Sequence, residues 1–180
     1  VEPGDTHLYL GTSGWISTVT DKQIVDIRRS MASIVGVQPD RYHYFAEMET
    51  AGKSLEWVKE HLALDEIDIY LEKKEVTDSL ESVYRSLYDY LCEVIDQVPA
   101  GSGGVLFTPW LHGNRCPFED ASARALFFNI GLETGKSELI RSVVEGIAFY
   151  CRFMMEAHER KLAVADTIRV CGGIANAPVI

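Results

Sequence analysis

The sequence lacks several features that assign a chain to a class immediately. No apolar run approaches the roughly 20 residues that a helix needs to cross a bilayer, and no run of lysines or arginines stands out. The net charge is −10, which disfavours a nucleic acid or an anionic membrane as a partner. Residues 1–5 have neither the charged nor the apolar part of a signal peptide, so we expect a cytoplasmic protein.

The sequence lacks the cysteine and histidine spacings of a disulfide framework or a metal site. No two of the four cysteines form a C-x-x-C pair, and the five histidines show no metal-ligand spacing. We therefore expect no metal ligands. We also expect reduced thiols buried in the core, at Cys92, Cys116, Cys151 and Cys171.

Length and composition are those of an ordinary globular domain. The 180 residues are 47% hydrophobic and 24% charged, enough for one domain with its own core. The chain starts at Val1 rather than at a methionine, and it stops just after a glycine pair that should open a helix. We interpret residues 1–180 as a piece of a longer protein.

Two glycine turns near the ends of the chain are its most informative features. The first turn is Gly11-Thr12-Ser13-Gly14, after Leu8–Leu10, and the second is Gly172-Gly173, after Ile168–Cys171. Each pattern predicts a strand that delivers a turn with exposed backbone N–H groups. Such turns suit phosphate oxygens, and the small hydroxyls of the first turn add further donors.

Hydrophobic periodicity predicts strands and helices between these turns. Alternation predicts a hairpin at 7–10 and 15–20, and strands at 31–37, 41–48, 105–107, 125–130 and 168–171. Spacing of three and four residues predicts helices after Gly52, at 78–96 and at 136–160, the last capped by Thr134 or Ser137. Residues 64–76 are charged and are expected to form an exposed connection. This order predicts an α/β domain with a mixed β-sheet flanked by helices.

Four stretches share the spacing of a known family. They are Leu10–Gly14, Glu49–Trp57, Leu106–Pro117 and the run Ala125–Gly146, in which Asn129 stands where the family has glycine. Together they resemble the C-terminal half of the FGGY carbohydrate kinases, within the actin-like, ribonuclease H-like ATPases, and most closely the xylulose kinases. Cys171–Asn176 resembles the family's adenosine motif, with Cys171, Ile174 and Ala175 in place of its glycine, alanine and basic residue.

The resemblance implies a fold, cofactors and a substrate class. Residues 1–180 would be the C-terminal nucleotide-binding domain, the truncated second domain of a two-domain kinase with the actin-like ATPase fold. ATP and Mg²⁺ are the implied cofactors, and a sugar, of the pentulose type such as xylulose, is the implied substrate. The implied contacts are Gly11, Thr12 and Ser13 at the phosphates, Gly52 beneath the nucleotide, and Gly172, Gly173 and Asn176 around the adenosine.

The family's general base is an aspartate that lies about twenty residues before the glycine turn and takes a proton from the sugar hydroxyl. Only ten residues precede Gly11, and Asp5 among them is expected in a turn. The resemblance therefore implies that the catalytic base and the sugar-binding domain lie upstream of Val1. The chain taken alone is expected to be inactive as a kinase.

Three residues in the stretches that resemble the kinase family can be explained either by a structural role or by a role in the site. Glu145 is expected on a helix surface, paired with Arg141 one turn back. His112 and Arg115 lie on the long loop and are expected at the surface, with a place in the cleft as the alternative.

Two other functions stay open. The chain could belong to another actin-like ATPase, although the run Ala125–Gly146 argues against it. It could instead belong to a regulatory homologue that has lost catalysis, which the departures at Cys171, Ile174 and Ala175 allow. A homodimer of the longer protein is a further open point.

Overall fold

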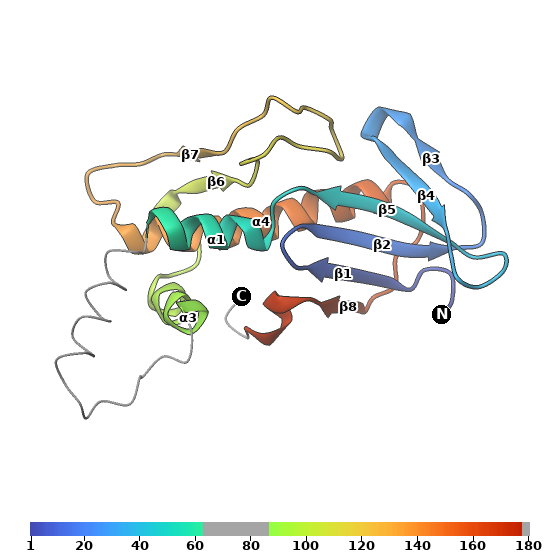
Figure 1. Ribbon diagram of the computed structural model, residues 1–180, viewed down its shortest axis with the longest axis horizontal. Helices are drawn as coiled ribbons and strands as arrows, with labels where there is room; N and C mark the ends of the chain where they lie inside the picture. Colours follow the sequence, from blue (N-terminus) through green and yellow to red (C-terminus); the bar gives the residue numbers. More distant parts are fainter. Residues whose placement is uncertain (63–86, 178–180) are drawn as a thin grey trace.

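The computed structural model describes residues 1–62 and 87–177, which form a mixed sheet with helices packed on it (Figure 1). The sheet has the strand order β3-β4-β5-β2-β1-β8. The strands are β1 (Thr6–Leu10), β2 (Gly14–Thr20), β3 (Val25–Asp26), β4 (Met31–Val35), β5 (Tyr42–Met48) and β8 (Ile168–Cys171). Neighbours are antiparallel except for β8, which runs parallel to β1. The predicted hairpin and the three other predicted strands of this sheet are confirmed, and β3 is an addition.

Helices and a second, two-stranded sheet complete the described fold. The helices are α1 (Gly52–His61), α3 (Leu87–Gln97) and α4 (Lys136–Glu159), and β6 (Leu106–Thr108) pairs antiparallel with β7 (Leu126–Phe128). Short 3₁₀ turns are η1 (Ile27–Arg29), η2 (Ser102–Gly104) and η3 (Gly173–Asn176). The helix predicted at 78–96 is confirmed from Leu87 onward. Its first part and the connection predicted at 64–76 lie outside the described residues.

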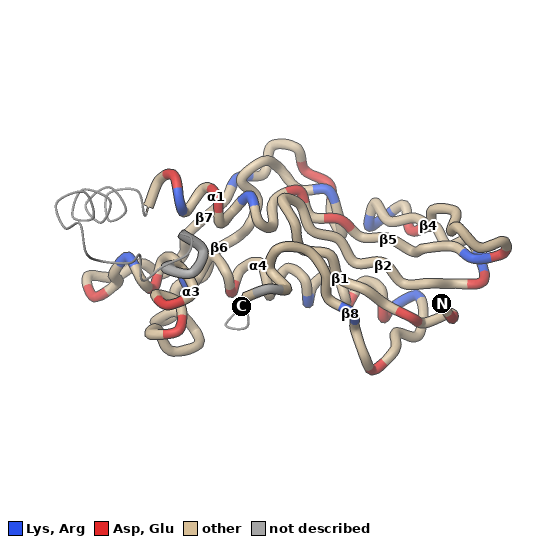
Figure 2. The backbone as a smooth tube through the Cα atoms, turned by 60° about the horizontal axis from the view of Figure 1, so that its bottom comes forward, with Lys and Arg blue, Asp and Glu red and all other residues tan. Residues whose placement is uncertain are grey.

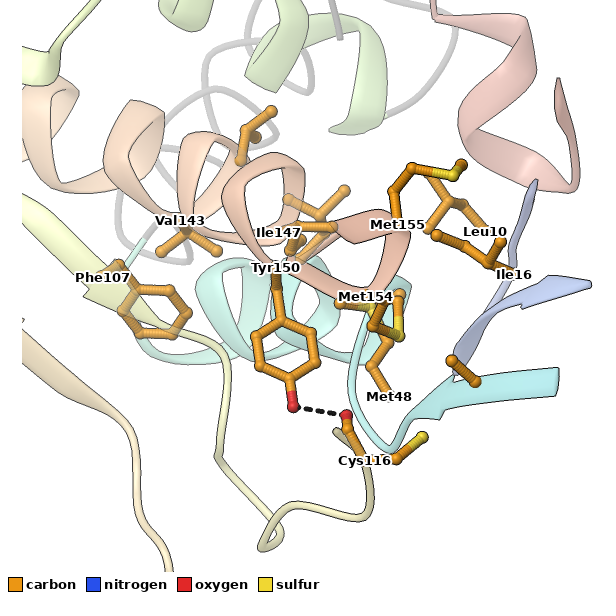
Figure 3. Packing of buried hydrophobic residues seen from close by; sticks show 14 of the residues in the cluster. Leu10, Ile16, Met48, Phe107, Cys116, Val143, Ile147, Tyr150, Met154 and Met155 are labelled. Carbon is orange, nitrogen blue, oxygen red and sulfur yellow. Dashed lines mark hydrogen bonds between the residues drawn. The ribbon is translucent and has the colours of Figure 1, made fainter. Parts of the chain in front are cut away.

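The core is built around α4, which is apolar along one broad face, as its periodicity predicts. This helix contacts β2 and β5 of the large sheet, β6 of the small sheet and both other helices. Figure 3 shows Val143, Tyr150 and Met154 of α4 beside Phe107 of β6 and Met48 of β5. Burying one such side chain contributes about 1.5–3 kcal/mol, so α4 holds the two sheets together.

The N-terminus of α4 differs from the prediction. Its N-cap residue is Gly135, whose backbone N–H donates a hydrogen bond of 3.0 Å to the Glu138 carboxylate. The choice of Thr134 or Ser137 as cap was wrong, because the Thr134 hydroxyl accepts a hydrogen bond of 3.0 Å from the Gly131 N–H instead. A carboxylate in the first turn replaces the hydroxyl that a cap usually offers.

The expectation of buried thiols holds for Cys116 and fails for Cys171. Cys116 is buried, Cys92 and Cys151 are partly exposed, and Cys171 is exposed. Cys171 is exposed because β8 is an edge strand of the described sheet, with β1 on one side only.

Charges are distributed without a basic stripe along the described chain. Figure 2 shows Lys and Arg positions interspersed with Asp and Glu positions. Within residues 1–62 and 87–177, no three His, Cys, Asp or Glu side chains group closely enough to hold a metal ion. In the same ranges, no helix combines the length and the apolarity needed to cross a bilayer.

Glu145 holds the loop before β6 against α4. Its carboxylate accepts hydrogen bonds from the Gly101 N–H at 2.9 Å, the Ser102 hydroxyl at 2.7 Å and Arg141 Nε at 2.9 Å. Arg141 also donates to the Ile95 carbonyl at 2.5 Å, which ties α3 to the same point. The predicted pair is confirmed, but it is largely buried, with Glu145 17% exposed. Burial raises the pKa of Glu145, and the hydrogen bonds outweigh it, so the pKa lies below its ordinary value of 4.5.

A Glu145→Gln variant is expected to lose about 1–2 kcal/mol of unfolding free energy at neutral pH, because a charged acceptor of three hydrogen bonds is replaced by a neutral one. The folded-state pKa is depressed, so this stabilisation is present above the unfolded pKa of Glu145 and is lost as the pH falls through the folded pKa. Urea denaturation at neutral and at acid pH measures the difference, which should shrink in acid.

The matched control is Glu156→Gln. Glu156 forms the same i,i+4 pair with Arg152 on the same helix, but it is 48% exposed. An exposed pair contributes at most about 1 kcal/mol, so we expect little change in this control. Equal losses in the two variants would contradict the role given to Glu145.

Candidate functional site

Three glycine segments that are far apart in the sequence meet at one edge of the large sheet. Gly11 lies in the turn between β1 and β2, Gly52 begins α1 with three residues between it and the end of β5, and Gly172 follows β8. β8 is parallel to β1, and the last residue of β5 pairs with the first residue of β2. The carboxyl ends of β1, β5 and β8 therefore lie at the same edge, where the sequence-predicted site residues come together.

The start of α1 binds the carbonyl groups of the β1–β2 turn. The Gly52 N–H donates to the Gly11 carbonyl at 2.8 Å. The Thr12 carbonyl accepts two more hydrogen bonds, from the Ala51 N–H at 3.1 Å and the Lys53 N–H at 3.0 Å. The first backbone N–H groups of a helix have no partner within it, so the turn satisfies three donors at this end of α1.

The same hydrogen bonds orient the N–H groups of the turn. A trans peptide points its carbonyl and its N–H in opposite directions, and among the described residues a cis peptide occurs only at Cys116–Pro117, away from this turn. Since the Gly11 and Thr12 carbonyls point at α1, the N–H groups of Thr12 and Ser13 point away from it. Within the described residues, neither these two N–H groups nor the two hydroxyls have a hydrogen-bond partner. The turn thus presents four unused donors, which is what an anion needs.

Gly52 serves the contact between α1 and the turn. A Cβ at position 52 would lie 2.5 Å from the Gly11 carbonyl oxygen and 3.2 Å from its carbon. Both are backbone atoms, so a larger side chain would push the turn away from α1. This contact explains why position 52 needs glycine, which the sequence pattern alone did not reveal.

Gly172 fits closely against β1. Its φ of +101° lies in the region that favours glycine, and a Cβ there would collide with the Leu10 carbonyl. Gly173 differs, because a Cβ at that position meets no atom within 4 Å. Gly172 therefore fixes the spacing between the two turns, and Gly173 leaves open space beside them.

The segment after Gly173 is anchored by the residue that departs from the family motif. Ile174 and Leu10 line a small apolar cavity of about 50 Å³. Leu55 of α1 and Val144, Ile147 and Ala148 of α4 line it too. The isoleucine thus packs on the core, and Asn176 is the last residue of η3.

The loop between β6 and β7 is tied to the end of β5. The Thr50 hydroxyl donates to the Pro109 carbonyl at 2.6 Å. Arg115 pairs with Glu47 at 2.9 Å and with Glu49 at 3.7 Å, and His112 is exposed. Arg115 is therefore an exposed residue that ties the loop to the end of β5 through ion pairs with two carboxylates.

Asn129 has a backbone reason to replace a glycine. Its φ is +66°, a left-handed conformation that asparagine tolerates better than most residues. Its side-chain amide donates to the Gly104 carbonyl at 3.1 Å, so the asparagine also ties β7 to the loop before β6.

Asp5 lies in the turn that precedes β1, as the sequence predicts. Its carboxylate accepts a hydrogen bond of 3.0 Å from the Glu2 N–H, and its own N–H donates to the Glu2 carbonyl at 3.0 Å. Asp5 lies just before the first residue of β1, and the glycine turn follows its last residue. The strand thus separates Asp5 from the candidate site.

The chain matches the FGGY family of carbohydrate kinases, C-terminal domain, over residues 7–180. A gluconokinase of Bacillus subtilis (strain 168) is 26% identical over 149 residues, which cover 83% of this chain and 27% of that protein. A xylulose kinase of the same strain is 24% identical over 174 residues, which cover 96% of this chain and 31% of that protein.

Solved structures give the same answer for the fold. The xylulose kinase from Rhodospirillum rubrum superposes with a TM-score of 0.80 at 20% identity, over 99% of this chain and 32% of that one. This likeness confirms the predicted actin-like ATPase fold. The chain spans 27% to 32% of the length of these three proteins. With the family matched from residue 7 to residue 180, this chain belongs to the FGGY carbohydrate kinases, in their C-terminal domain.

Proposed function

We propose that the protein is an ATP-dependent carbohydrate kinase and that this chain supplies the half that binds the nucleotide. Thr12 and Ser13 bind the phosphates, with Gly11 keeping the turn narrow. Gly52 and Gly172 place this turn between α1 and the adenosine side, where Gly173 and Asn176 lie. The general base and the sugar site belong to the part of the protein outside this chain.

The orientation of the β1–β2 turn carries the proposal. Its two carbonyl groups are taken up by α1, so its two unused N–H groups and two hydroxyls face the other way. Phosphoryl transfer needs positioned donors and neutralised charge more than covalent chemistry from the protein. A fixed set of donors in a chain with a net charge of −10 is consistent with local recognition of phosphate oxygens.

The finer assignments concern the sugar and the metal. Curated relatives carry the names gluconokinase, xylulose kinase and ribulokinase, and we propose a pentulose such as xylulose as the substrate. Mg²⁺ would neutralise phosphate charge when bound. No three acidic, histidine or cysteine side chains of the described residues group closely enough to hold the ion, and we propose that phosphate oxygens supply its ligands from this side. Since ATP and free sugars meet there, we assign the protein to the cytoplasm.

A Thr12→Ala, Ser13→Ala double variant is expected to bind MgATP at least about a hundredfold more weakly than the unchanged chain. Each hydroxyl lost from a charged acceptor removes about 1.5–3 kcal/mol when the hydrogen bond is well formed. The backbone N–H groups stay, so binding should weaken rather than vanish. Isothermal titration calorimetry of the chain with MgATP measures the change.

Ser122→Ala is the control, since Ser122 is likewise exposed in a turn but lies on the loop between β6 and β7. Its affinity for MgATP should equal that of the unchanged chain. If the double variant bound MgATP as tightly as the unchanged chain, the Thr12 and Ser13 hydroxyls would not be contacts of the nucleotide. Failure of the folded, unchanged chain to bind MgATP would overturn the nucleotide assignment and favour a homologue that has lost catalysis.

A further inference from the structure

Tyr9 brings a phenol hydroxyl to the β1–β2 turn. The Tyr9 ring stacks on Trp15 across the hairpin, with ring centroids 5.2 Å apart and planes 21° apart. Trp15 in turn contacts the Phe45 ring at 5.3 Å and the His7 ring at 4.7 Å. This group of rings holds the phenol at one place, so the position of its hydroxyl is set by packing.

The Tyr9 hydroxyl reaches the glycine that opens the turn. It lies so close to Gly11 that any Cβ at position 11 would collide with it. The collision would be with the end of a side chain, in contrast to Gly52 and Gly172, whose neighbours are backbone. Gly11 therefore leaves the space that the phenol occupies, and a larger residue there would displace Tyr9.

Tyr9 and the unused N–H groups lie on the same side of the turn. Leu10 shares a cavity with Leu55 of α1, so α1 is on the Leu10 side of the strand. Successive side chains of a strand point to opposite faces, which puts Tyr9 on the side away from α1. The N–H groups of Thr12 and Ser13 also point away from α1, as their peptide planes require.

The hydroxyl of Tyr9 is unused within the described part of the chain. Neither its oxygen nor its proton takes part in an intramolecular hydrogen bond there, and the side chain is only half-buried. A phenol is a good donor to an anion. Its packing gives the ring a reason to be aromatic, whereas the hydroxyl has no structural role among the described residues.

We propose that the Tyr9 hydroxyl is a further donor to the phosphate group that Thr12 and Ser13 bind, and that it favours nucleotides with a β- or γ-phosphate over a nucleoside monophosphate. This inference rests on the proposed function. The turn recognises the terminal phosphates, and Tyr9 closes their donor set on the side of the aromatic rings. Phenylalanine at position 9 would keep the ring packing and lose the donor.

The test compares Tyr9→Phe with the unchanged chain by calorimetric titration with MgATP and, separately, with AMP. Tyr42→Phe is the matched control, because Tyr42 is also half-buried on the same sheet but lies at the far end of β5, opposite Thr20. We expect Tyr9→Phe to bind MgATP about tenfold more weakly, the effect of one hydrogen bond to a charged group, and to bind AMP unchanged. Its melting temperature should match that of the unchanged chain, since no intramolecular bond is lost.

The outcomes separate the two proposals. Equal MgATP affinity in Tyr9→Phe and the unchanged chain would overturn the role of Tyr9 and leave the nucleotide site standing. Equal weakening toward MgATP and AMP, or a lowered melting temperature, would show that the hydroxyl acts through packing and would also overturn that role. No MgATP binding by the folded, unchanged chain would overturn the proposed function, and the role of Tyr9 with it.

Discussion

A Gly172→Ala variant is expected to lose about 3 kcal/mol of unfolding free energy. A non-glycine residue at a positive φ costs about 1–2 kcal/mol, and forcing a methyl group into packed backbone costs about 1–3 kcal/mol. Both apply here, because Gly172 has a φ of +101° and a ψ of 179°, a region that is essentially restricted to glycine, and the Leu10 nitrogen lies 3.0 Å from the added Cβ, with the Leu10 carbonyl closer still. Urea denaturation at neutral pH measures the loss.

Gly173→Ala is the matched control one residue further on. The added Cβ meets no atom within 4 Å, so the free energy of unfolding should change by less than about 0.5 kcal/mol. Similar values for the two variants would mean that β8 and β1 do not keep the spacing described here. The contact between the two glycine turns would then have no energetic basis.

A Gly52→Val variant is expected to lose about 2–3 kcal/mol and to bind MgATP more weakly. The valine Cβ would meet the Gly11 carbonyl oxygen at 2.5 Å, and rotating χ1 cannot relieve a clash that involves Cβ itself. The turn must then move from α1, which frees the Gly11 and Thr12 carbonyls to rotate and misaligns the N–H groups. Urea denaturation and calorimetric titration with MgATP measure the two effects.

Lys53→Val is the control for this variant. It places the same residue one position later in the helix, at a side chain that is 58% exposed and pairs with Glu56 at the surface. We expect a loss of no more than about 1 kcal/mol and unchanged affinity for MgATP. A stable Gly52→Val variant with full affinity would contradict the account of α1 as the support of the turn.

Most strands of the large sheet could be predicted because each is long enough to show its own pattern of hydrophobic residues. Alternation over residues 7–20 indicates the β1–β2 hairpin, although β2 is buried on both faces, at Ile16 and Thr18 as well as at Ser17 and Val19. β3 escaped prediction because two residues, Val25 and Asp26, are too short for any period. The N-cap of α4 escaped because a carboxylate three residues on replaced the usual hydroxyl.

The sequence predicted which glycines would meet at the candidate site, but it did not predict what each glycine contacts there. Motif spacing pointed to Gly11, Gly52 and Gly172, yet it could not show which glycine faces backbone and which faces a side chain. That distinction depends on strand order, which brings β8 beside β1. Tyr9 was missed for a related reason. In the sequence it is one more aromatic residue of an alternating strand, and its place over the turn depends on stacking against Trp15.

The measurement that tests the central claim most directly is amide hydrogen exchange of the chain, resolved by NMR, with and without MgADP. Without nucleotide, the N–H groups of Thr12 and Ser13 should exchange fast, because they have no partner among the described residues. Gly52 and Lys53, bonded to the turn, should exchange slowly in both states. We predict that MgADP slows exchange at Thr12 and Ser13. Binding that leaves both as fast as before would place the phosphates elsewhere and contradict the account.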